Sequence, residues 1–104
     1  MKRIMYASGG FVTSDAIADA LMDYASVLAV INSSDVVDCE GIDEEGTVRR
    51  IRMLLGPASQ IMAMQMDGDA VEMHVDETVA ELQHRTRLRL PDYTTLGADG
   101  MPST

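Results

Sequence analysis

Hydrophobic positions recur with a helical period in one segment of this chain and alternate with polar positions in several others. From residue 13 to residue 31, apolar side chains return at every third or fourth position, which predicts a helix with one buried face. The residues of this stripe are Ile17, Leu21, Tyr24, Leu28 and Ile31. Thr13 is a good N-cap for the helix, and the polar residues 32–34 end it.

Strand patterns lie on both sides of this helix. Residues 2–8 are a short apolar run and predict a first strand, which ends at Gly9 and Gly10. Residues 36–42 and 47–55 predict two more strands. Because a short Gly-containing turn joins these two, we expect them to form a hairpin.

Residues 57–66 fit two different structures. As a helix, the segment has Pro57 at a permitted first position; as a strand, its methionines share one face. The strand is favoured, because Asp67-Gly68 follows and residues 70–75 alternate again, a pattern typical of a hairpin.

Together these elements predict an α+β fold. Asp76 can cap a second helix, which Pro91 ends, so the order of elements is β-α-β-β-β-β-α. We expect a two-layer sandwich with a mixed, mostly antiparallel sheet, helices on one face, and a right-handed crossover through the first helix. Residues 1–90 then form a single domain. Residues 91–104 form a flexible C-terminal tail, since they lack apolar periodicity.

Composition excludes several classes of function. The 104 residues carry a net charge of -9, which argues against direct binding to nucleic acid or to anionic membranes. No apolar run is long enough to span a bilayer. The single cysteine, Cys39, excludes an internal disulfide and fits a reducing cytoplasm. We therefore expect a cytoplasmic protein, and the sequence indicates no cofactor.

The charges are segregated along the sequence. No Lys or Arg occurs from Ile4 to Val48, a segment that holds nine of the seventeen acidic residues. Three acidic residues at four-residue spacing form a stripe along one side of the predicted first helix. They are Asp15, Asp19 and Asp23. Two arginine clusters come later and consist of Arg49, Arg50, Arg52, Arg85, Arg87 and Arg89. The stripe is either a solvated helix face or a surface that contacts arginines of a second copy or of a basic protein.

The predicted junction between the first strand and the first helix is a candidate ligand site. Its residues are Gly9, Gly10, Thr13 and Ser14. A Gly-Gly turn before a helix can present backbone N–H groups to an anion. However, neither the dinucleotide-binding pattern nor the P-loop pattern is present, and Asp15 places negative charge beside the helix start. The alternative is a tight turn that binds nothing.

A group of soft ligands is the only metal-like pattern in the sequence. It consists of Met62, Met64, Met66, Met73 and His74. Thioether and imidazole ligands suit Cu(I), and a strand would align the first three sulfurs on one side. The alternative is that these methionines fill the core in place of aromatic residues, which are only 4% of the chain.

Candidate catalytic residues are few. His74 and Asp76 could form an oriented base, but the sequence marks no nucleophile near them. Cys39 is predicted to be a buried or an inert thiol, because the neighbouring acidic residues would raise its pKa. An enzyme is therefore not favoured. We expect a protein-interaction module that acts as a homodimer, and the alternative is a domain that binds a small ligand or a soft metal.

Overall fold

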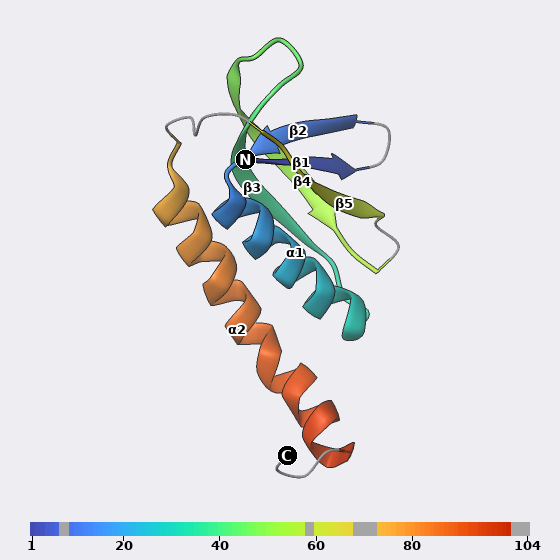
Figure 1. Ribbon diagram of the computed structural model, residues 1–104. Helices are drawn as coiled ribbons and strands as arrows, with labels where there is room; N and C mark the ends of the chain where they lie inside the picture. The colour runs from blue at the N-terminus through green and yellow to red at the C-terminus, as the bar shows by residue number, and fades with distance from the viewer. Residues whose placement is uncertain (7–8, 58–59, 68–72, 101–104) are drawn as a thin grey trace.

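The protein is a two-layer α+β sandwich, which confirms the fold class expected from the sequence. This computed structural model describes residues 1–6, 9–57, 60–67 and 73–100. Over these residues, a five-stranded sheet carries two helices on one face (Figure 1). The elements are β1 (Lys2–Tyr6), β2 (Gly9–Thr13), α1 (Asp15–Val30), β3 (Asp35–Ile42), β4 (Val48–Leu55), β5 (Ile61–Gln65) and α2 (Val75–Gly100).

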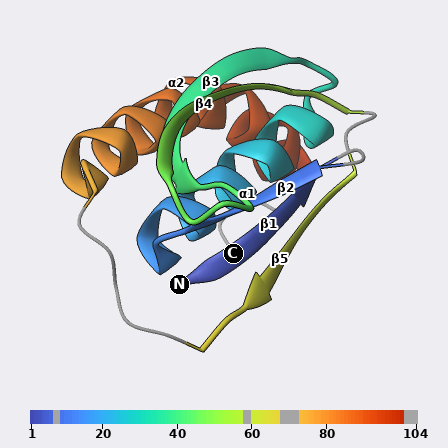
Figure 2. The ribbon, with the colours of Figure 1, turned by 90° about the horizontal axis from the view of Figure 1, so that it is seen from above.

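The sheet has the strand order β4-β3-β2-β1-β5, and each of these pairings is antiparallel. The predicted β3–β4 hairpin is present and pairs along its whole length, from Asp35 opposite Leu55 to Ile42 opposite Val48. By contrast, β2 joins β3 through the single pair Val12–Ile42. The three strands β2-β1-β5 therefore meet the β3–β4 hairpin at one narrow seam. Helix α1 lies against the sheet, and α2 lies beside α1 (Figure 2).

The N-terminal segment differs from its prediction. Gly9 and Gly10 do not form a turn before the helix, because they begin the additional strand β2, which pairs with β1. The expected right-handed crossover is therefore absent: α1 links β2 to its antiparallel neighbour β3. Close strand approach explains Gly10, since a Cβ atom there would lie 2.8 Å from the carbonyl oxygen of Ile4.

The later elements are mostly as predicted. The ambiguous segment is a strand over Ile61–Gln65, where it pairs with β1. The expected strand at residues 70–75 lies largely outside the described residues, and Val75 begins α2. The helix was expected to end before Pro91, but α2 continues to Gly100. The flexibility assigned to residues 91–104 stays a prediction.

The core lies between the sheet and α1, as the helical stripe predicted. Ile17, Leu21, Tyr24 and Leu28 are all 0% exposed, whereas Ile31 is the C-cap residue and is partly buried. They pack against sheet residues that include Ile4, Phe11, Val37, Cys39, Met53 and Leu55. From α2, Leu82 enters the same cluster. Burying this apolar surface is the main contribution that holds the two layers together.

One glycine is required by close packing inside the sheet. A Cβ atom at Gly41 would lie 2.4 Å from Cδ2 of Phe11 and 2.8 Å from Cδ1 of Ile51. Gly41→Ala is therefore expected to destabilise the protein by about 1–3 kcal/mol, because a buried aromatic ring must move. Gly9→Ala is the matched control, since no atom lies within 4 Å of its Cβ position. Urea denaturation that gives equal midpoints for both variants would contradict this packing.

Candidate functional site

The face of the sheet turned away from the helices is the main candidate surface, and we call it the outer face. Alternation places it: Ile4 and Val37 are buried against the helices, so their neighbours along each strand point outward. The strand register then gives its members. They include Arg3, Met5, Val36, Asp38, Val48, Arg52, Leu54, Met62 and Met64.

The outer face gathers most of the exposed apolar side chains of the described residues. Among the described residues, eight large hydrophobic side chains are exposed, and six of these eight belong to the outer face. The six are Met5, Val36, Val48, Leu54, Met62 and Met64. They fall into two groups of cross-strand neighbours: Met5 lies opposite Met62 on β1 and β5, whereas Leu54 lies opposite Val36 in the β3–β4 hairpin. Exposed apolar groups of this kind are typical of a contact surface.

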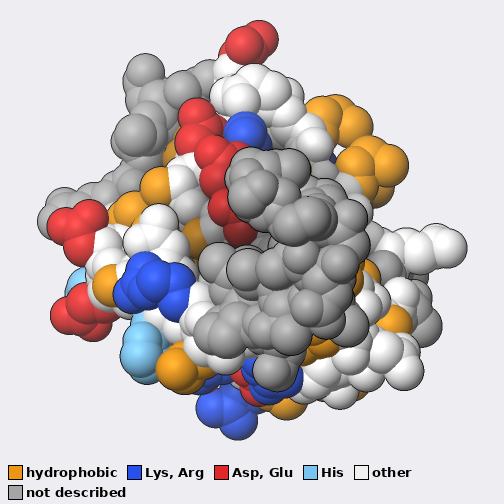
Figure 3. All heavy atoms as spheres, turned by 90° about the horizontal axis from the view of Figure 1, so that it is seen from below, with side chains coloured by type: hydrophobic (Ala, Val, Ile, Leu, Met, Phe, Trp, Pro, Cys, Tyr) orange, Lys and Arg blue, Asp and Glu red, His pale blue; other side chains and the backbone are white. Residues whose placement is uncertain are grey.

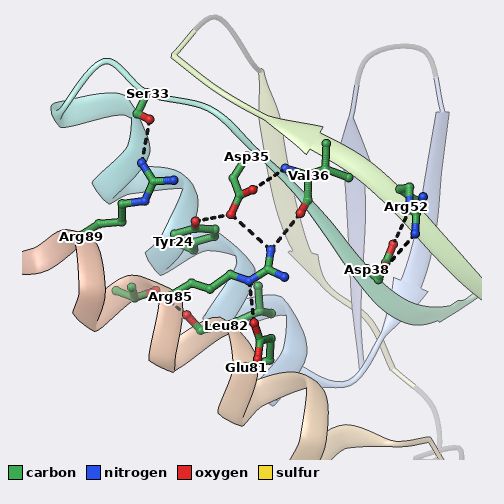
Figure 4. Close-up of polar contacts among 11 residues, drawn as sticks. Tyr24, Ser33, Asp35, Val36, Asp38, Arg52, Glu81, Leu82, Arg85 and Arg89 are labelled. Atoms are coloured by element: carbon green, nitrogen blue, oxygen red, sulfur yellow. Dashed lines mark hydrogen bonds and ion pairs between the residues drawn. The ribbon is translucent and has the colours of Figure 1, made fainter.

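The first arginine cluster is paired within the chain. Arg52 donates two hydrogen bonds to the Asp38 carboxylate at 2.9 and 3.4 Å (Figure 4). Arg50 lies 3.7 Å from the same carboxylate. The Arg52 hydrogen bond is the main reason why the pKa of Asp38 is lowered. Arg49 pairs with Asp43 at 2.9 Å near the hairpin turn. The hairpin register thus brings the segregated acidic and basic segments together.

The second arginine cluster holds α2 to the rest of the domain. The Tyr24 hydroxyl donates to Asp35 at 2.5 Å, and Arg85 reaches the same carboxylate at 3.2 Å and the Val36 carbonyl at 2.9 Å (Figure 4). Burial raises the pKa of Asp35, but these donors outweigh burial, so its pKa is lowered. Arg89 donates to Ser33 at 2.8 Å, whereas Arg87 is exposed.

The acidic stripe of α1 is also partly neutralised from within. Asp15 pairs with the N-terminal amine of Met1 at 2.9 Å, and Asp19 pairs with Lys2 at 2.6 Å. Asp23 is exposed and forms no ion pair with any described residue. The sequence did not reveal the pairing with Lys2, because it requires that β1 run beside the start of α1.

The glycine candidates do not form an anion cradle at a helix start. Gly9 and Gly10 lie within β2, separated from α1 by the rest of that strand. Ser14, rather than Thr13, is the N-cap, and its hydroxyl accepts from the Ile17 N–H at 3.1 Å. Thr13 is fully buried and donates to the Glu40 carbonyl at 2.8 Å. Gly10, Thr13 and Ser14 thus have structural roles that explain their identities, whereas close packing does not explain Gly9.

The soft-ligand candidates are divided between two faces. Met62 and Met64 lie on the outer face, and the Met66 N–H donates to the Met1 carbonyl at 3.0 Å. Met73 packs against the core, and its sulfur is 3.8 Å from the Thr13 hydroxyl oxygen. His74 pairs instead with Glu40, as described below. Within the described residues, no group of three or more His, Cys, Asp or Glu side chains is placed to hold a metal ion.

A polar groove lies between the start of α2 and the β3–β4 hairpin. Its volume is about 510 Å³, and its wall includes Glu40, Arg50, His74, Glu77 and Glu81. His74 Nδ1 lies 2.6 Å from the Glu40 carboxylate. Sequence analysis missed this pair, since its members are far apart in the chain and no motif links them. The groove carries both signs of charge but no evident catalytic arrangement.

Cys39 lines the same groove and is buried, which confirms the prediction of a buried thiol. It is 2% exposed, and burial raises the pKa of the thiol to about 12, with a further contribution from Asp38 and Glu40. A thiol with this pKa stays protonated near neutral pH and is a poor nucleophile. The groove is therefore suited to binding polar groups rather than to covalent chemistry.

Comparison with known proteins adds no assignment. Protein-family models, curated proteins and solved structures give no match to this chain.

Among the described helices, none combines the length and the apolar character needed to cross a membrane. Seen from below, acidic and basic side chains are interspersed rather than gathered into one field (Figure 3). The outer face is therefore the strongest candidate for a functional surface.

Proposed function

We propose that this protein is an interaction module that binds a protein partner through the outer face of its sheet. The observation that carries the proposal is the concentration of exposed apolar side chains there: six of the eight large exposed hydrophobics of the described residues lie on this face. Covering them would contribute about 25 cal/mol per Å² of apolar surface removed from water.

Charge gives this face a secondary role in recognition. Arg52 and Asp38 satisfy each other across the β3–β4 hairpin, while Arg3 lies opposite Met64 beside the apolar residues. Surface pairs of this kind contribute little affinity but restrict the orientation of a partner. Contacts between the arginine clusters and acidic residues of a second copy are thus not needed for binding. A partner with an apolar patch, including a second copy of this chain, fits the surface better than a uniformly basic protein.

Leu54→Lys tests the outer face directly. Leu54 is 54% exposed, so lysine is tolerated by the fold, but its charge would have to be buried in a complex. Immobilised wild-type protein should capture a partner from an extract of the source cells. The immobilised variant should capture at least tenfold less of that partner. Leu88→Lys is the matched control, because Leu88 is 63% exposed on α2. Equal capture by all three would contradict the proposal.

A further inference from the structure

Among the described residues, β5 is an edge strand, and it carries neither a charge nor a proline. It ends the strand order beside β1, and Figure 2 shows it at the margin of the sheet. Edge strands commonly carry charges or Pro that block pairing with another chain. The opposite edge, β4, carries Arg49, Arg50 and Arg52, whereas β5 has the uncharged sequence Ile-Met-Ala-Met-Gln.

The ladder between β1 and β5 fixes which backbone groups point outward. The Met66 N–H donates to the Met1 carbonyl, so this pair is hydrogen-bonded. Hydrogen-bonded and non-hydrogen-bonded pairs alternate in an antiparallel ladder, and the register then directs the backbone of Met62 and Met64 toward β1. The N–H and C=O groups of the alternate residues point away from β1, to the side that no described strand occupies, which we call the free side. These residues are Ile61, Ala63 and Gln65.

This free side is complementary to itself. A two-fold axis through Ala63 places Ala63 opposite its own counterpart and Ile61 opposite Gln65 of a second copy. Each outward-pointing residue then gives one hydrogen bond and receives one, as in a regular antiparallel pair. On the outer face, Met62 lies across from Met64 of the second copy. Since Met5 is the other neighbour of Met62, the apolar patches of both copies become continuous.

Charge is compatible with a second copy at this edge. The chain carries a net charge of -9, so two copies repel each other in general. β5 itself is uncharged, and the acidic residues at the start of α1 are compensated, since Asp15 pairs with the Met1 amine and Asp19 with Lys2. Residual repulsion is screened by salt.

We propose that two copies of this chain join through antiparallel β5–β5 pairing centred on Ala63, which forms one continuous sheet with a doubled outer face. This inference deepens the proposed interaction function and rests on it, because the dimer supplies the larger contact surface. The dimer is expected to persist or tighten at high salt, unlike one held by pairs between arginine and carboxylate groups.

Disulfide trapping reads the register. Met62→Cys and Met64→Cys, prepared separately and mixed under mild oxidation, should form a cross-linked heterodimer, because the two positions face each other across the axis. Each variant alone should cross-link far less, since neither position faces itself. The native Cys39 does not interfere, because it is buried. Equal cross-linking of all samples, or none, would overturn the register.

Ala63→Pro tests the edge without disturbing β1 pairing. Proline is tolerated at an edge where the lost N–H faces solvent, so circular dichroism should show a folded protein. Because an edge contact is small, sedimentation velocity is best run at about 0.1–1 mM protein. The variant should dimerise at least tenfold more weakly, whereas Leu54→Lys, on the other half of the sheet, should dimerise normally.

The outcomes separate this inference from the proposed function. A dimer that survives Ala63→Pro but is lost in Leu54→Lys would assign self-association to the outer face and overturn the edge proposal. A wild-type chain that stays monomeric at these concentrations would overturn it as well, even if an extended peptide of another protein binds the edge. In either case, partner capture by the outer face is measured independently and stands or fails alone.

Discussion

Leu82→Ala is expected to lower the free energy of unfolding by about 2–5 kcal/mol, the usual cost of removing a buried leucine side chain. Leu82 is 2% exposed and belongs to the core cluster, where it is the buried contribution from the described side chains of α2. Since small domains are stable by only about 5–15 kcal/mol, this is a large share of the total. Urea denaturation followed by circular dichroism measures the loss.

Hydrogen exchange should show where the loss is concentrated. Without Leu82, α2 keeps only the partly buried Val75 and Val79 and the polar contacts of Arg85 and Arg89 among its described contacts with the rest of the domain. Amides of α2 should therefore exchange faster than those of α1. Leu88→Ala is the control: at 63% exposure, it should change stability by no more than about 0.5 kcal/mol. If the two variants were equally stable, α2 would not be docked through Leu82.

Local periodicity was sufficient to predict the most regular parts of this fold. Four of the five residues in the predicted α1 stripe are fully buried, because a helix repeats its buried face regardless of what it packs against. The β3–β4 hairpin followed from two strand patterns and a Gly-containing turn. These features depend on neighbouring residues alone, which is why the sequence is informative about them.

The N-terminal hairpin could not be predicted in the same way. A Gly pair is normally a turn signal, but Gly10 lies in a strand. It must be glycine there, because the backbone of Ile4 lies too close for a side chain. This requirement comes from the neighbouring strand. Consequently the sequence predicted the sandwich and its helices, but it placed the glycine pair in a turn before the helix instead of at the start of β2.

The candidate site likewise depends on register rather than on composition. The sequence showed both arginine clusters and the acidic segment, but only the β3–β4 register places Arg52 opposite Asp38. The outer face is defined in the same way, since Met5 and Met62 become neighbours through the pairing of distant strands. Methionine spacing indicated one face of a strand, yet only the whole sheet shows that this face is exposed.

Raising the pH above 9 is expected to destabilise the protein steeply through Cys39. Burial raises the pKa of this thiol from 9.0 to about 12. Between these values, the folded state keeps the proton that the unfolded state loses, so stability is full below pH 9 and falls as the pH rises. Three pKa units correspond to about 4 kcal/mol. Urea midpoints measured at a series of pH values, with reductant present, would show this loss.

Cys39→Ala separates the thiol from other alkaline effects. The variant should be less stable at pH 7, because it leaves a small cavity, but its stability should change little between pH 9 and 10. Above pH 10, a second loss is expected in both proteins, since burial also raises the pKa of Tyr24 to about 12. Tyr24→Phe should remove that second loss only. Parallel pH profiles for wild type and Cys39→Ala would show that the thiol is not held in its buried, protonated state.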